Sequence, residues 1–136
     1  MLTGYWIDGK EELAVIYEMR RRIFGYEVDE MDRWAKHLLI LDEDEPVAVG
    51  SLLQNLHHIY ELYDVGVLEE KRLQGIGGFT AKVLINDAWE HDAVGMELIA
   101  DDKTEKFFNK LGFLRDLDGE RETGSGRTGL YMSRTF

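Results

Sequence analysis

A short glycine-containing segment, Arg72-Leu73-Gln74-Gly75-Ile76-Gly77-Gly78, most constrains the fold of this 136-residue chain. It follows an apolar run that ends in Val65-Gly66-Val67 and precedes a stretch with helical periodicity, residues 79–89. The sequence therefore predicts a strand, a glycine turn and the start of a helix. Unpaired backbone N–H groups converge at a helix start, and the helix dipole favours negative charge there. Because glycines also let a ligand lie against the main chain, the segment is typical of a phosphate-binding loop.

Two common phosphate-binding motifs do not fit this segment. A P-loop requires Lys and then Ser or Thr after its last glycine, whereas Phe79 and Thr80 follow Gly78 here. A dinucleotide-binding fingerprint requires a third glycine at the position of Thr80. The segment instead matches the pattern Arg/Gln-x-x-Gly-x-Gly/Ala. The alternative, for a motif this short, is an ordinary glycine-rich turn between a strand and a helix.

Length, charge and cysteine content limit the class of protein. A chain of this length with 44% hydrophobic residues is expected to form one domain with a sizeable core. No apolar run approaches the roughly 20 residues of a membrane span. The formal net charge of −11 disfavours nucleic acid and anionic membranes as partners. The absence of cysteine excludes disulfides and makes the cytoplasm the expected compartment. The four histidines lack metal-ligand spacing, so no metal is expected.

Hydrophobic periodicity predicts strands at residues 2–7, 37–41, 47–53, 59–67, 96–100, 113–117 and 129–134. It predicts helices at residues 10–24, 29–35, 77–90 and 102–111, the last with a capping box formed by Asp102 and Glu105. The acidic residues 42–45 indicate a hairpin loop. This order predicts a mixed α/β (α+β) fold, in which helices flank a mostly antiparallel central sheet.

The predicted order of elements resembles that of the GNAT N-acetyltransferase superfamily over nearly the whole chain. The glycine segment resembles the acetyl-CoA pyrophosphate loop of that family, and Phe107-Phe108-Asn109-Lys110-Leu111-Gly112-Phe113 resembles its Phe-Tyr-x-Lys-Leu-Gly-Phe helix end. The front half resembles the ElaA/YjcF-type group in Arg20-Arg21-Arg22-Ile23-Phe24, in the acidic residues 27–32 and in Ala35-Lys36-His37. Residues 1–136 are therefore expected to form a single N-acetyltransferase-like domain.

The resemblance implies acetyl-CoA as co-substrate and direct transfer of its acetyl group to a primary amine. It implies that the backbone of Val65, Gly66 and Val67 binds the pantetheine arm, for which a plain buried strand is the alternative. The implied cofactor-binding set is completed by Arg72, Leu73, Gln74, Gly75, Ile76, Gly77, Gly78 and Phe108. A small-molecule or peptide amine is the expected acceptor, and a homodimer is compatible with the sequence.

Glu61 is the leading candidate for a general base. An amine with a pKa near 10.4 is only about one part in a thousand neutral at pH 7, so a base is useful. An apolar strand can raise a carboxyl pKa into the useful range, and several GNAT enzymes keep a glutamate six residues before the position of Val67. Strand alternation predicts one face formed by Ile59, Glu61, Tyr63, Val65 and Val67. The alternative is a glutamate that pairs with a neighbour or reaches solvent. Asp64 is the second candidate, with a salt-bridged strand end as its alternative.

Phe108 departs from the family pattern, because the family tyrosine at this position protonates the departing thiolate and phenylalanine has no hydroxyl. The thiolate, with a pKa near 8.5, could leave unaided. Tyr63 or Tyr131 could supply the proton instead.

The chain could also be a catalytically weak or silent acyl-CoA-binding module, and Phe107 and Phe108 could simply pack in the core. A nucleotide-binding α/β domain is the third function class, against which Thr80 and the mixed strand order count.

Overall fold

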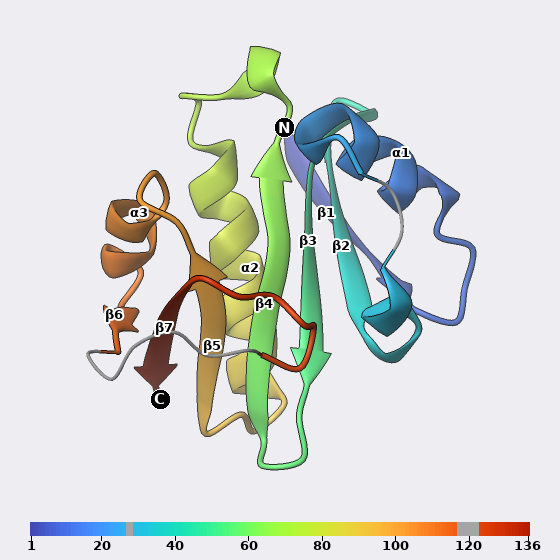
Figure 1. The fold of residues 1–136 in the computed structure, drawn as a ribbon. Helices are drawn as coiled ribbons and strands as arrows, with labels where there is room; N and C mark the ends of the chain where they lie inside the picture. The colour runs from blue at the N-terminus through green and yellow to red at the C-terminus, as the bar shows by residue number, and fades with distance from the viewer. Residues whose placement is uncertain (27–28, 117–122) are drawn as a thin grey trace. The chain divides into compact units, whose positions relative to one another are not determined.

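The computed structural model describes residues 1–26, 29–116 and 123–136 of the chain (Figure 1). Its elements follow the order β1 (Leu2–Asp8), α1 (Ala14–Phe24), η1 (Glu30–Trp34), β2 (Lys36–Asp42), β3 (Glu45–Gln54), β4 (Ile59–Val67), η2 (Glu69–Lys71), α2 (Ile76–Glu90), β5 (Gly95–Ala100), α3 (Glu105–Asn109), β6 (Leu114–Arg115) and β7 (Leu130–Thr135). Within these residues the hydrogen-bonded strand order is β1-β2-β3-β4-β5-β7-β6. The β4–β5 pair is parallel, whereas the β1–β2, β2–β3, β5–β7 and β6–β7 pairs are antiparallel. The predicted mixed α/β fold with a mostly antiparallel sheet is confirmed.

The chain forms two compact units, which are described separately. The first comprises Met1–Leu52 and Asp64–Leu84, and the second comprises Leu53–Tyr63 and Ile85–Phe136. Strands β3 and β4 and helix α2 each contribute residues to both units.

In the first unit, α1 packs on one face of the sheet formed by β1, β2 and β3, and α2 contacts β3 from the other face. Leu39 of β2 lies opposite Val49 of β3, and both pack with Ile16 and Met19 of α1 in one core cluster. On the other face, a Cβ added to Gly50 would lie 2.6 Å from Cδ1 of Leu84 in α2. Two apolar faces on one sheet explain why β2 and β3 read as nearly continuous hydrophobic runs.

In the second unit, β5 lies between β4 and β7 (Figure 1). Glu61 of β4 is paired with Glu97 of β5, which in turn is paired with Ser133 of β7. Directly paired residues share a face of a sheet, so these three side chains point to the same side. The opposite side is apolar and includes the buried Leu98 and Met132.

The helix starts differ from the predictions because acidic side chains compete for the backbone. Helix α1 begins at Ala14 rather than at residue 10, since Asp8 accepts from the N–H of Lys10 and Glu12 accepts from the N–H of Ala14. The second predicted helix is the short 3-10 helix η1, which opens with a capping box between Asp29 and Asp32.

The last predicted helix is also shorter than expected, and its predicted capping box is wrong. Helix α3 begins at Glu105 with Thr104 as its N-cap, because Asp101 closes the preceding turn by accepting from the N–H groups of Lys103 and Thr104, both at 2.9 Å. The strand predicted at residues 113–117 is the two-residue β6, and its predicted end at residue 117 lies outside the described residues.

The boundaries of β4 match the prediction, but the predicted alternation along it is wrong beyond Tyr63. Asp64 has φ +52°, in the left-handed region that residues other than glycine rarely adopt. Residues 60–63 are all buried, and residues 64–67 are all half-buried. A left-handed residue interrupts the two-residue period, so Val65 and Val67 cannot be assigned to the face of Glu61 by counting.

Candidate functional site

The glycine segment forms an exposed turn that leads into α2 in the first unit. Leu73 and Gly75 have φ +64° and +80°, and glycine adopts such values without a Cβ penalty. The first helical hydrogen bond joins the N–H of Phe79 to the carbonyl of Gly75 at 3.1 Å. The leading N–H groups of a helix have no intrahelical acceptor, so α2 presents donors beside an exposed loop.

The space around this turn is open. Residues 72–75 are exposed, whereas Ile76 is buried and anchors the start of the helix. A Cβ added to Gly75 or Gly78 would meet no atom within 4 Å. Gly77 and Gly78 are half-buried in the first turn of α2, where the helix dipole is positive. Open backbone donors at a positive helix end are what an anionic phosphate requires.

The predicted pantetheine strand and the glycine turn meet in the first unit. Nε of Arg72 donates to the carbonyl of Val67 at 3.2 Å, which ties the turn to the end of β4. A Cβ added to Gly66 would lie 2.5 Å from Cζ of Phe24 and 2.8 Å from Cγ2 of Ile23. Packing of α1 against the strand therefore favours a glycine at position 66, without any contribution from a cofactor.

Glu61 lies in the second unit and is buried, with 2% of its surface exposed. Its carboxylate accepts hydrogen bonds from the Thr123 hydroxyl at 2.7 Å, from the Ser125 N–H at 2.9 Å and from the Ser125 hydroxyl. Sequence analysis missed Thr123 and Ser125, because nothing in the local pattern links them to β4. Glu61 thus anchors the segment that precedes β7.

Opposing effects act on the pKa of Glu61. Burial raises the pKa above the ordinary value for glutamate, and the hydrogen bonds from Ser125 and Thr123 oppose this rise. The carboxylate of Glu97 on the paired strand adds a smaller upward contribution. The net result is a carboxyl group with a raised pKa, as a general base near neutral pH requires.

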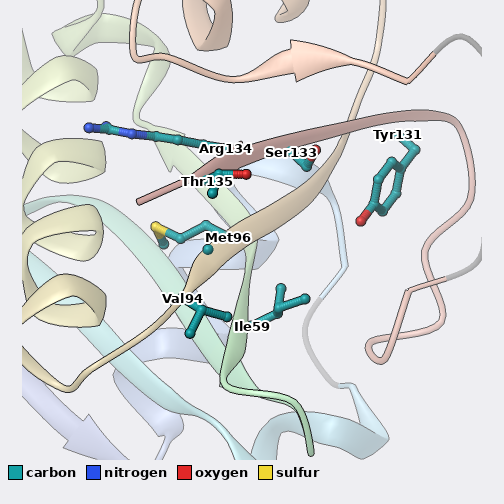
Figure 2. Close-up of a pocket in the computed structure, with 8 residues that line it drawn as sticks. Ile59, Val94, Met96, Tyr131, Ser133, Arg134 and Thr135 are labelled. Atoms are coloured by element: carbon teal, nitrogen blue, oxygen red, sulfur yellow. The ribbon is translucent and has the colours of Figure 1, made fainter.

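The two tyrosines considered as proton donors lie in different surroundings. Tyr63 is buried, and the Arg127 guanidinium lies 4.7 Å from the centre of its ring. The Tyr131 hydroxyl donates to Oε2 of Glu97 at 2.8 Å. Figure 2 shows Tyr131 at a cavity of about 310 Å³ in the second unit, which is otherwise lined by Ile59, Val94, Gly95, Met96, Ser133, Arg134 and Thr135.

Phe108 packs in the core of the second unit. It is 8% exposed and makes edge-to-face contacts with Phe107 and Phe113, at centroid distances of 5.0 and 6.0 Å. The predicted alternative role of Phe108 as a core residue therefore has direct geometric support, while its contact with a cofactor stays a prediction.

Among the described residues, no helix is both long enough and apolar enough to cross a membrane. The same residues contain no group of three His, Asp or Glu side chains arranged to hold a metal ion.

Comparison with known proteins adds independent information. The model of the acetyltransferase (GNAT) family matches residues 5–113. The uncharacterized N-acetyltransferase YjcF of Bacillus subtilis (strain 168) is 29% identical over 112 residues, which cover 76% of this chain and 79% of that protein. Escherichia coli ElaA has a similar fold, with a TM-score of 0.81 and 20% identity over 98% of this chain and 99% of the other.

A Bacillus subtilis acetyltransferase solved in complex with CoA is similar over 100% of this chain and 99% of its own, with a TM-score of 0.79 and 16% identity. At these identities the solved structures establish the fold alone, whereas the family model covers most of the chain. The protein therefore belongs to the acetyltransferase (GNAT) family.

Proposed function

We propose that this protein transfers the acetyl group of acetyl-CoA to a primary amine by direct attack of the amine on the thioester. The observation that carries the proposal is the exposed glycine turn at the start of α2, because it offers backbone donors to a pyrophosphate (residues 73–78). Residues 65–67 would bind the pantetheine arm, and the link from Arg72 to Val67 holds both segments together. A CoA complex of a structurally similar acetyltransferase supports the same cofactor.

Bound acetyl-CoA supplies an acetyl group that is already activated as a thioester. The protein must orient the amine and remove its proton. Glu61 has the raised pKa that suits a base, but the carboxylate is almost fully buried. The Ser125 hydroxyl donates to Oε2 of Glu61, so Ser125 can accept a proton from the amine while it passes its own proton to Glu61. Glu61 would then act through Ser125 rather than by direct contact.

A catalytically silent acyl-CoA-binding module on the same fold is the second candidate function. Two observations favour it. Phe108 has no hydroxyl and packs against two other phenylalanines. The position at which the family has its proton-donating tyrosine is therefore occupied by a core side chain. Glu61 already accepts three hydrogen bonds from its own chain.

Turnover separates the two functions. The purified protein would be incubated with acetyl-CoA and a panel of primary amines: a polyamine, an aminoglycoside, free amino acids and a lysine-containing peptide. Free thiol would be followed over time, and mass spectrometry would detect the acetylated amine. The proposal expects amine-dependent thiol release with one acetylated amine per thiol. Acetyl-CoA binding without turnover on any amine would favour the silent module, and failure to bind CoA would contradict both functions.

A further inference from the structure

The first unit contains a fully buried guanidinium, that of Arg20 in α1, which is 0% exposed. Its two terminal nitrogens bind both carboxylate oxygens of Asp32, and Nη2 also donates to the Ser51 hydroxyl at 2.9 Å. Its Nε lies 3.3 Å from Oδ2 of Asp64 in β4. Burial of a charge is costly unless it is paired on several sides, so this arrangement fixes the elements that supply the partners.

Asp64 is the residue of β4 whose backbone is left-handed, with φ +52°. Such a conformation is less favourable than an extended one for a residue with a Cβ, although aspartate tolerates it better than most residues do. The Asp64 side chain is 5% exposed, with Arg20 at one carboxylate oxygen and the Tyr26 hydroxyl at the other. These two contacts thus hold Asp64 against α1 and against Tyr26.

A second contact fixes the same stretch of strand two residues later. Gly66 lies close to Phe24 and Ile23, so that a Cβ added there would displace the ends of these two side chains. The backbone of Val65 is therefore held between the Arg20–Asp64 ion pair and the contact of Gly66 with the end of α1. Both contacts lie within the first unit, which also contains the glycine turn.

We propose that Arg20 and Asp64 are positioning residues for acetyl-CoA. Their ion pair holds β4 in its left-handed conformation at Asp64 and so sets the direction of the backbone groups of residues 65–67 that bind the pantetheine arm. This inference rests on the proposed function, because it assumes that acetyl-CoA lies along this part of β4. A positioning role differs from a general stabilising role. If the pair positions β4, the loss of acetyl-CoA affinity in a variant should not parallel the drop in its melting temperature.

Three variants separate these roles. Asp64→Gly keeps the left-handed conformation accessible but removes the carboxylate, so β4 is no longer held. Asp64→Asn keeps the size of the side chain, an oxygen that can face Arg20, and the ability to adopt positive φ. Asp32→Asn is the matched control, because Asp32 is an equally buried partner of Arg20 that lies in η1 and not on β4.

The experiment measures the dissociation constant of acetyl-CoA by calorimetry, the KM for acetyl-CoA, kcat, and the melting temperature of each variant. For Asp64→Gly we expect a dissociation constant and a KM that are raised roughly tenfold, because acetyl-CoA must then order this part of β4 as it binds, with a smaller change in kcat. Asp64→Asn should recover affinity to within about threefold of the wild-type protein. Asp32→Asn should melt at a lower temperature and bind acetyl-CoA within about twofold of the wild-type protein.

Two results would overturn the inference alone. One is wild-type affinity in Asp64→Gly, and the other is an equal loss of affinity in Asp32→Asn, which would show that affinity follows stability. A wild-type protein that binds no CoA would instead contradict the proposed function, and this inference would fail with it.

Discussion

Ser125 and Glu61, 64 positions apart in the sequence, are joined by two hydrogen bonds, one from the Ser125 N–H at 2.9 Å and one from its hydroxyl. The Thr123 hydroxyl adds a third donor. The carboxylate is therefore buried and well satisfied, and the proposed proton transfer to Glu61 passes through the Ser125 hydroxyl. A role of Glu61 as proton acceptor can therefore be tested by variants at Glu61 and at Ser125.

Replacement of Glu61 by Gln should lower turnover roughly 10²–10⁴-fold if Glu61 is the proton acceptor, with little change in acetyl-CoA affinity. The loss should become smaller at high pH, where more of the acceptor amine is neutral without help. Ser125→Ala should show the same pH dependence, because it removes the relay but leaves the carboxylate. The check is kcat/KM as a function of pH for both variants, and profiles parallel to the wild-type profile would exclude the role.

The same Glu61→Gln variant should alter how stability depends on pH. Burial raises the pKa of Glu61, so the folded protein binds this proton more tightly than the unfolded chain does. The contribution to stability is then complete below the ordinary value of 4.5 and is lost as pH rises from there through the raised pKa. The melting temperature of the variant relative to the wild-type protein should therefore increase with pH across that window. A constant or decreasing difference would contradict the raised pKa.

His37 should give the opposite trend in the first unit. It is fully buried, with Nδ1 2.7 Å from the Ser51 hydroxyl and Nε2 2.9 Å from the carbonyl of Asp32. Burial lowers the pKa of His37 below its ordinary value of 6.5, so the unfolded chain takes up this proton first on acidification. Wild-type stability should fall as pH drops below that value, and His37→Gln should reduce the slope. Melting curves of the two proteins that remain parallel from neutral to acidic pH would refute this prediction.

Phe108→Tyr should destabilise the protein rather than restore a catalytic acid. The ring at position 108 is packed against two other phenylalanines, so an added hydroxyl would be buried without a partner, at a cost of about 1–3 kcal/mol. Phe107→Tyr is the matched control, because Phe107 is half-buried and its hydroxyl can reach water. Thermal unfolding should separate the two variants. An unchanged melting temperature with faster thiol release in Phe108→Tyr would show that position 108 faces the cofactor.

The local sequence pattern was sufficient to predict most of the helices and strands. The boundaries of β4 and the turn into α2 follow from an apolar strand, a glycine cluster and a helical stripe, all of which act over a few residues. The left-handed backbone of Asp64 could not be predicted in this way, because the carboxylate of Asp64 meets Arg20, which lies far away in the sequence. The left-handed residue also interrupts the alternation predicted for Val65 and Val67.

The partners of Glu61 were also beyond the reach of local pattern. The apolar strand around Glu61 predicted a raised pKa, and the structure agrees in direction. Thr123 and Ser125 are brought to Glu61 only by the path of the chain into β7. Their Gly-Ser-Gly surroundings are typical of an exposed loop and give no sign of burial.

The most direct test of the central claim is acetyl-CoA binding to Gly78→Glu and Gly78→Gln. Gly78 lies in the first turn of α2, where a new side chain meets no atom within 4 Å and an acidic residue interacts favourably with the helix dipole. Gly78→Glu should therefore fold at least as stably as the wild-type protein but repel the pyrophosphate, with a dissociation constant raised about tenfold or more. Gly78→Gln, of nearly the same size and without charge, should bind within about threefold of the wild-type protein. Equal acetyl-CoA affinity for the two variants in calorimetry would contradict a pyrophosphate site at the start of α2.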